Sequence, residues 1–186
     1  MDCTGSVVGR TYQEPGVDEQ PPRFPRKSID PDAALVAQLR RADTGAVEAL
    51  VRAAREQPQV RPDRVALFGH SRGGGAALQY VLKGGVVHAL ILDSAGYPED
   101  VVERATQVTA PTLLLHGTAD SPADGGSART SVERARLFEA AMRRAGRSVE
   151  SKYYREGRHN GIFESASQHE DELRRSVAFL RRHLRD

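Results

Sequence analysis

A serine at the apex of a predicted strand–turn–helix is the feature that most constrains what this chain can fold into. The sequence Gly69-His70-Ser71-Arg72-Gly73 follows the apolar run 65–68 and precedes a helical pattern of small residues. Such a sharp turn puts its apical residue in a strained backbone conformation, and glycines on either side leave room for it. The pattern therefore predicts a nucleophile elbow with Ser71 as the nucleophile, in preference to a purely structural glycine-rich turn.

The chain around this turn alternates between short apolar runs and helical patterns. The apolar runs fall at 65–69, 86–92, 111–116 and 149–154, and the helical patterns at 72–83, 130–145 and 167–184. Regular alternation of strands and helices is typical of a parallel sheet with helices packed on it. We therefore expect an α/β protein, a three-layer α/β/α sandwich around a mostly parallel sheet.

Two of these helices have predicted starts, and the last has a predicted core face. Thr130 with Glu133 and Ser167 with Glu170 fit the capping box, in which a hydroxyl and a carboxylate bond the first backbone N–H groups of a helix. In the final helix, four apolar residues at helical spacing predict the side that packs on the sheet. These residues are Leu173, Val177, Leu180 and Leu184.

The amino-terminal part of the chain has a different character. Residues 1–27 are rich in glycine and proline and have almost no apolar periodicity, so we expect a loop-like lead-in to a single domain over residues 1–186. Helical patterns follow at 33–39 and 46–54, and Gln57-Pro58 ends the second of them.

Composition excludes several classes of function. The chain has 186 residues, and its 27 basic and 25 acidic side chains leave a net charge of only +2, which argues against nucleic-acid binding. No apolar run approaches the roughly 20 residues that cross a bilayer, and no secretory signal is evident, so we expect no membrane association and a cytoplasmic location. Cys3 is the only cysteine, which leaves no intramolecular disulfide and no cysteine-pair metal site.

A serine hydroxyl needs a base to attack an ester at neutral pH, and the base needs an acid that fixes its tautomer. The acid that we favour is Asp120, because it follows the apolar run 112–115 in a loop at the carboxyl end of the predicted sheet, where Ser71 also emerges. Asp93, at the end of the preceding strand, and Asp124, a few residues beyond Asp120, remain competing acids.

The candidate base is His159. It lies in Gly157-Arg158-His159-Asn160-Gly161, a loop between the last predicted strand and the final helix. Such a loop also opens at the carboxyl end of the sheet. The other five histidines lie in the final helix, beside a strand, or next to tight turns where structural hydrogen bonds are expected: His70, His88, His116, His169 and His183.

These motifs resemble those of the α/β-hydrolase superfamily, and specifically of the dienelactone-hydrolase-like and prolyl-oligopeptidase-like serine hydrolases. The matching stretches are 69–74, 115–120 and 157–160, and the resemblance covers about residues 40 to 185. It implies Ser71 as nucleophile, Asp120 as acid and His159 as base.

The chain departs from that family before the elbow, where the family carries further strands and a loop that donates one oxyanion-hole N–H. The backbone N–H of Arg72 is one expected donor, and the second is expected from residues 1–27, near Thr4 to Gly9. The missing strands leave a sheet edge that relatives cover, and we expect a truncated gene product, a fragment, or a chain that pairs with a partner, for example in a homodimer.

From these features we expect a hydrolase of small-molecule carboxylic esters or related acyl bonds that needs no metal or organic cofactor. One alternative is a peptidase or amidase of the prolyl-oligopeptidase type. A second alternative is a non-catalytic remnant of the fold that serves in binding.

Overall fold

The computed structural model describes residues 44–185 and is built around four parallel strands. The expected lead-in, the helical pattern 33–39 and Cys3 lie outside the described residues. The strands lie in the order β1-β2-β3-β4, with bounds β1 Ala66–His70, β2 Ala89–Asp93, β3 Thr112–Gly117 and β4 Val149–Tyr154. Because all four run in the same direction, their carboxyl ends meet at one edge of the sheet.

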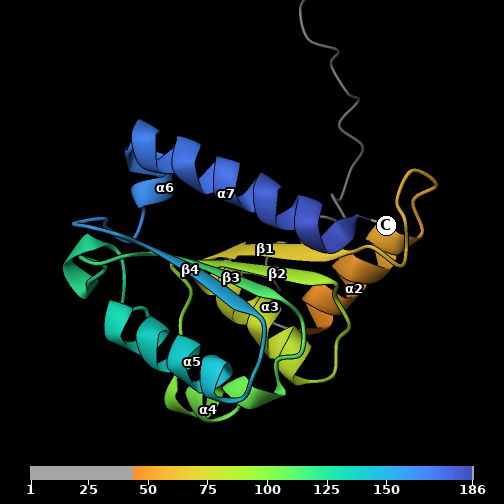
Figure 1. Ribbon diagram of the computed structural model, residues 1–186, viewed down its shortest axis with the longest axis horizontal. Coiled ribbons are helices and arrows are strands. Elements are labelled where there is room, and N and C mark those ends of the chain that lie inside the picture. Colours follow the sequence, from red (N-terminus) through yellow and green to blue (C-terminus); the bar gives the residue numbers. More distant parts are fainter. Residues whose placement is uncertain (1–43, 186) are drawn as a thin grey trace, which may run out of the picture. The chain divides into compact units, whose positions relative to one another are not determined.

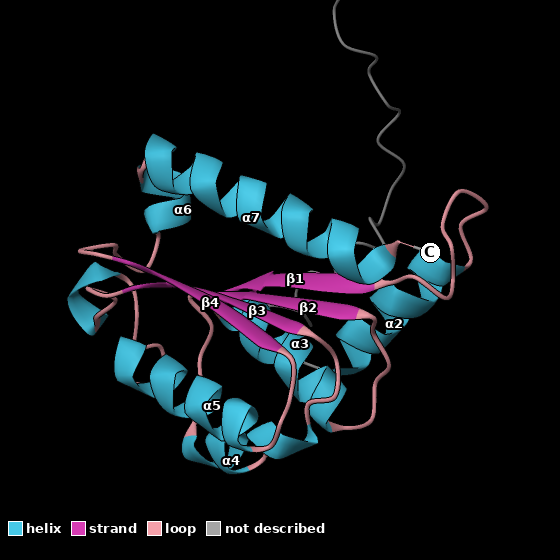
Figure 2. Ribbon diagram, in the orientation of Figure 1, coloured by secondary structure: helices cyan, strands magenta, loops and turns pink. Residues whose placement is uncertain are grey.

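Helices cover both faces of the sheet and make the expected three layers (Figures 1 and 2). One face carries α6 and α7, and the other carries α2, α3, α4 and α5. Their bounds are α2 Thr44–Arg55, α3 Arg72–Leu82, α4 Glu99–Glu103, α5 Val132–Arg144, α6 Gly161–Glu164 and α7 Ala166–Leu184. Short 3-10 helices cover Ala105–Gln107 and Pro122–Asp124. Among these described helices, none combines the length and apolar character needed to span a bilayer.

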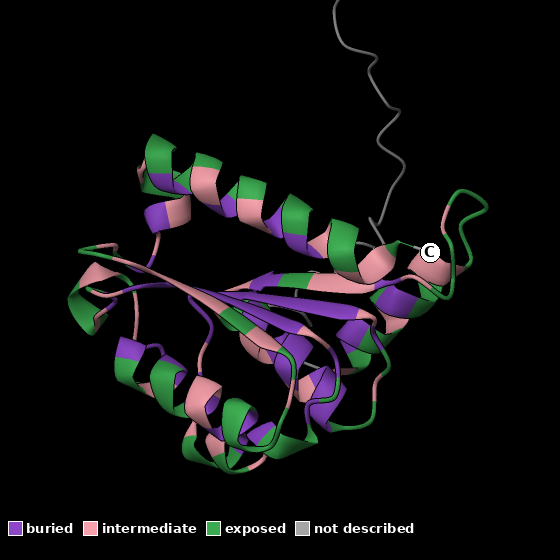
Figure 3. Ribbon diagram, in the orientation of Figure 1, coloured by how far each residue is buried: buried purple, intermediate pink, exposed green. Residues whose placement is uncertain are grey.

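The core lies on both faces of the sheet, because successive side chains of a strand point in opposite directions. In β2, Leu90 and Leu92 pack toward α2, α3 and α5, whereas Ala89 and Ile91 pack toward α7. Every residue of β2 and β3 is buried (Figure 3). These two central strands therefore form a rigid base for the loops at their carboxyl ends.

The element boundaries correct three expectations. β2 begins at Ala89, three residues later than predicted. Both predicted capping boxes are wrong, because α5 begins after Ser131 without a side-chain cap, and α7 begins after Ser165, whose Oγ accepts from the Gln168 N–H. Thr130 and Ser167 matched the capping pattern, but each lies one or two residues away from the cap position.

The predicted core face of the last helix is also partly wrong. Leu180 and Leu184 pack on the sheet, but Leu173 and Val177 are 57% and 38% exposed. The side of α7 that is buried is largely polar, with Gln168, Glu172, Ser176 and Phe179. The buried face of α7 is therefore not the face that carries most of its apolar residues. This buried polar face lies next to the carboxyl end of the sheet.

Glu172 is the acidic residue of this buried face, and its burial costs free energy of folding. Its side chain is fully buried, Gln168 Nε2 donates to one carboxyl oxygen at 2.7 Å, and the other oxygen has no hydrogen-bond partner within residues 44–185. Burial, with the nearby charge of Asp93, raises the pKa of Glu172 to about 7. The folded protein therefore keeps a proton on this side chain up to about pH 7, and the carboxyl group is ionised above that pH.

We expect Glu172→Gln to raise the melting temperature at pH 8 and to change it little at pH 5. A carboxyl group with a raised pKa in the folded state lowers stability as pH rises from the unfolded-state pKa to the folded-state pKa, so the cost is fully present above pH 7. Removing the buried carboxylate should stabilise the fold by about 3 kcal/mol at pH 8. Glu170→Gln, at an exposed site of the same helix, is the control, and an equal effect at both pH values would contradict the expectation.

Candidate active site

Ser71 lies at the apex of a sharp turn between β1 and α3. Its backbone is strained, with φ 51° and ψ −117°, although serine has a Cβ that disfavours positive φ. The Ser71 N–H donates to the Asp93 carbonyl at 2.8 Å, and its own carbonyl accepts from the Gly75 N–H at 3.1 Å. The turn is therefore fixed both to the neighbouring strand and to the helix that follows.

The glycines of this turn differ in importance. A Cβ on Gly69 would lie 2.6 Å from backbone atoms of Gly73 and Gly74, and a Cβ on Gly74 would lie 2.6 Å from the Ala95 side chain. By contrast, a Cβ on Gly73 would meet nothing within 4 Å. The expectation that glycines on both sides of Ser71 avoid collisions thus holds for Gly69 and is wrong for Gly73. On the helix side of Ser71, the glycine that avoids a collision is Gly74.

A continuous chain of hydrogen bonds joins three side chains that are distant in sequence. His159 Nε2 lies 2.7 Å from Ser71 Oγ, and His159 Nδ1 lies 2.8 Å from Asp120 Oδ2. His159 is 4% exposed and Asp120 is 6% exposed. In this geometry the imidazole can accept the serine proton on one nitrogen while the carboxylate fixes the proton on the other.

The Asp120 carboxylate has further partners that the sequence analysis did not identify. Thr130 Oγ1 donates to its second oxygen at 2.9 Å, and His116 Nε2 lies 3.3 Å from the oxygen that His159 contacts. Burial raises the pKa of Asp120, but the hydrogen bonds from His116, His159 and Thr130 together lower it below its usual value. The Asp120 carboxylate therefore stays ionised although it is almost inaccessible to solvent.

The sequence contained a signal for Thr130 that we interpreted as a helix cap. A threonine shortly before a helix fits a cap, yet here its hydroxyl serves the acid loop and also accepts from the Ser127 N–H at 2.7 Å. His116 was expected to have a structural hydrogen bond, and its Nε2 donates to the Thr130 carbonyl at 2.6 Å.

The competing acids lie elsewhere. Asp93 is 1% exposed and bonds His70 Nδ1 at 2.7 Å through its carboxylate. Asp124 accepts from the Ser121 hydroxyl and pairs with Arg158. Of the three candidate acids, Asp120 is the one whose carboxylate has a hydrogen bond to His159.

Arg72 is the first residue of α3. The N–H groups of a helix's first turn are not used by its own hydrogen-bond ladder, and they point along the axis toward the space before the helix. In this chain that space adjoins Ser71. The expected second oxyanion donor, near Thr4 to Gly9, lies outside the described residues.

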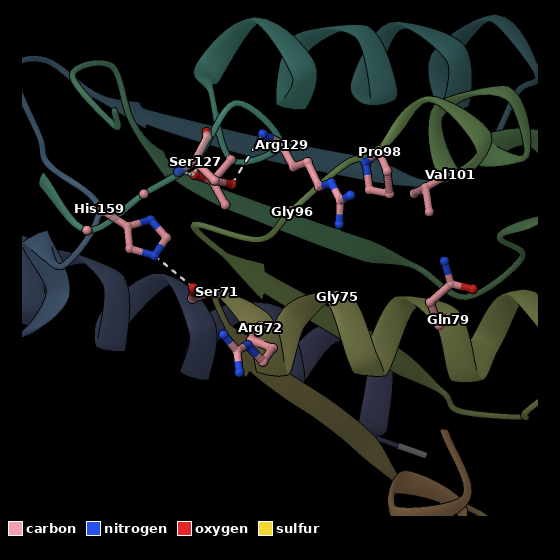
Figure 4. Close-up of a pocket in the computed structure, with 13 residues that line it drawn as sticks. Ser71, Arg72, Gly75, Gln79, Gly96, Pro98, Val101, Ser127, Arg129 and His159 are labelled. Atoms are coloured by element: carbon pink, nitrogen blue, oxygen red, sulfur yellow. Dashed lines mark hydrogen bonds between the residues drawn. The ribbon is translucent and has the colours of Figure 1, made fainter. Parts of the chain in front are cut away.

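A cavity of about 430 Å³ opens next to Ser71 and His159. One wall is the face of α3 with Arg72, Gly75 and Gln79, and the opposite wall carries Arg129 (Figure 4). The remaining lining residues come from α4, from the loop before it and from the loop before α5: Gly96, Pro98, Val101, Gly125, Gly126, Ser127 and Thr130. None of these described lining residues is acidic, and two are arginines.

Tyr97 does not line this cavity. Its side chain is fully buried in the core and packs against Phe138, with ring centroids 4.9 Å apart. Across residues 44–185, no three histidine, cysteine or acidic side chains are grouped as metal ligands.

Solved structures share this fold at low sequence identity. Porphyromonas gingivalis dipeptidyl peptidase 4 aligns with a TM-score of 0.63 and 19% identity over 76% of this chain and 22% of that protein. Pyrococcus horikoshii acylaminoacyl peptidase aligns with a TM-score of 0.63 and 17% identity over 82% of this chain and 30% of that protein. A Pyrococcus furiosus esterase aligns with a TM-score of 0.63 and 14% identity over 80% and 64% of the two chains.

This chain thus spans between about a fifth and two thirds of those three structures. A comparison with curated proteins gives no match. A family model does match: residues 24–184 fit the model of the dienelactone hydrolase family.

We expect Gly69→Ala to destabilise the fold by about 2 kcal/mol or more, because its new methyl group meets backbone that has no room to shift. Gly73→Ala is the matched control, since its methyl group enters open space within a helix, where alanine is favoured over glycine by up to about 1 kcal/mol. Thermal unfolding of the two purified variants measures the difference. Equal losses in both would contradict the geometry described for this turn.

Proposed function

Because this chain belongs to the dienelactone hydrolase family, we propose that it is a serine hydrolase that cleaves carboxylic esters through an acyl-enzyme. The observation that carries this proposal is the hydrogen-bonded sequence from Ser71 through His159 to Asp120 at the mouth of a cavity. The fold alone would not support it, since one fold serves many functions.

In the first half of the proposed reaction, Ser71 Oγ attacks the ester carbonyl while its proton passes to His159 Nε2. Asp120 stabilises the imidazolium that forms, and Thr130 and His116 keep the carboxylate in place. The Arg72 N–H is the proposed donor to the oxyanion of the tetrahedral intermediate. Collapse of this intermediate breaks the bond to the alcohol, which leaves with the proton from His159.

In the second half, a water molecule attacks the acyl-enzyme. His159 accepts a proton from the water and returns it to Ser71, so that the carboxylic acid is released and the enzyme is restored. The positive φ of Ser71 places its side chain at the apex of the turn, where it lines the cavity.

Peptide hydrolysis is the alternative reaction, and the peptidases among the similar folds favour it. The two reactions share their acyl-enzyme chemistry, but peptide cleavage has a much poorer leaving group and makes greater demands on protonation by His159. A non-catalytic remnant is the other alternative. Its distinguishing feature is a folded chain with an unreactive serine.

The first test is labelling of the purified chain with a fluorophosphonate probe, followed by peptide mass spectrometry. We expect an adduct on Ser71 that heat denaturation prevents, and no adduct in Ser71→Ala. Asp120→Asn should lower hydrolysis of 4-nitrophenyl acetate by roughly 10⁴-fold, because the wrong imidazole tautomer would face the serine.

A folded chain that neither labels nor turns over 4-nitrophenyl acetate would remove the hydrolase proposal and favour the non-catalytic remnant. Cleavage of acyl-peptide anilides at rates similar to those of the matching esters would instead favour the peptidase. Circular dichroism of each variant establishes that it is folded.

The charge of the cavity leads to an expectation for the substrate. Among the described lining residues, Arg72 and Arg129 are cationic and none is acidic, so an acyl group that carries a negative charge gains from Coulomb attraction. We expect a 4-nitrophenyl monoester of succinate to have a lower KM than the neutral butyrate ester.

Arg129→Gln should reduce this preference by roughly 5- to 10-fold in kcat/KM, with little change for the neutral ester. Arg134→Gln, at a position of α5 outside the cavity lining, is the control. A preference for the neutral ester in the unmodified chain would contradict the expectation.

A further inference from the structure

The residue before Ser71 has two hydrogen-bond partners in opposite directions. His70 Nδ1 lies 2.7 Å from Asp93 Oδ2, and His70 Nε2 lies 3.4 Å from Asn160 Oδ1. Asp93 ends β2 and is buried, whereas Asn160 directly follows His159 in the loop that carries the proposed base. One imidazole thus connects the sheet to the loop of His159.

Both partner atoms are oxygens, which favours the charged form of the imidazole. Neutral histidine has a single ring N–H, so it can donate to only one of them, whereas the imidazolium donates to both. We propose that His70, as an imidazolium held by Asp93, is a positioning residue that holds Asn160 and thereby keeps His159 aligned with Ser71. This inference rests on the hydrolase function proposed above.

Packing around His70 supports the positioning role. The His70 ring lies 5.3 Å from the His159 ring and 5.0 Å from the ring of Phe163, which it meets edge to face. His70 therefore contacts His159 and Asn160 in this loop and Phe163 in helix α6, which follows the loop. Phe163 is itself 70% exposed, whereas His159 is 4% exposed.

The loop is held from beneath by the buried polar face of α7. A Cβ on Gly161 would lie 2.5 Å from the Gln168 amide oxygen, and a Cβ on Gly157 would lie 3.0 Å from it, so this amide packs closely against both ends of the loop. Gln168 in turn donates to Glu172. The segment that carries His159 is therefore enclosed between His70 on one side and Gln168 on the other.

The charges that face His70 favour its protonated form. Burial lowers the pKa of His70, but the hydrogen bond and charge of Asp93 raise it by more, and Asn160 and Glu172 add to the increase. The ring of His159 is the other titratable group in contact with it. Two carboxyl groups, Asp93 from the sheet and Glu172 from α7, thus act on one imidazolium.

The sign of the pH effect follows from these groups. A histidine with a raised pKa keeps its charge below that pKa and loses it as the pH rises through it. Loss of the proton removes the Nε2–H that binds Asn160, while the bond to Asp93 persists. Alignment of His159, and with it the rate, should therefore fall on the alkaline side.

The test is the pH profile of kcat/KM for 4-nitrophenyl acetate from pH 6 to 10, measured on the full chain and on three variants. We expect an alkaline decline in the unmodified chain and its absence in Asn160→Ala, together with a loss of roughly 10- to 100-fold at neutral pH from misalignment. Asn160→Asp should move the decline to higher pH, because a second carboxylate facing the imidazolium raises its pKa further. His183→Gln, near the end of α7, is the matched control and should keep the unmodified profile.

A purely structural contact would lower the rate of Asn160→Ala without changing the shape of its profile, and that result would overturn the proposal. An Asn160→Asp profile that declines at the same pH as the unmodified chain would also overturn it. Failure of the hydrolase proposal is distinguishable, since the unmodified chain would then show neither turnover nor fluorophosphonate labelling of Ser71.

Discussion

The carboxylate of Asp120 is the point on which the site depends, because segments from three parts of the chain meet there. Thr130, His159 and His116 all contact its two oxygens. A buried carboxylate without such partners would be protonated or would displace its neighbours. With them it stays ionised and holds an imidazole 2.7 Å from Ser71 Oγ. The loop after β3, the segment before α5 and the loop after β4 are thus interdependent.

A second set of interactions lies on the opposite side of the nucleophile. Asp93 binds the Ser71 backbone through its carbonyl and His70 through its carboxylate. Beneath it, α7 turns a polar face inward at the cost of exposing Leu173 and Val177. The helix thereby places amide and carboxyl groups under the loop of His159, where leucine side chains would offer no hydrogen bonds.

Much of this arrangement was predictable from sequence, because strong local signals carry it. The alternation of apolar runs and helical patterns predicted the α/β layers, and the carboxyl ends of the strands predicted which loops would meet. The roles of Thr130 and Gly73 were not predictable from local pattern, since capping boxes and glycine motifs do not report which neighbour a side chain will meet in three dimensions. The inward face of α7 was missed for the same reason: apolar spacing predicts a core face only where tertiary hydrogen bonds do not compete with it.

The pairing of β1 with β2 has a consequence for how such a chain can vary. Gly69 is opposite Leu92 and His70 is opposite Asp93 in the parallel register. A slip of one residue would turn every side chain of β2 to the other face of the sheet, and Asp93 would leave His70. The register between these two strands therefore fixes the catalytic turn as well as the sheet, because Asp93 contacts both His70 and the Ser71 backbone only in this pairing.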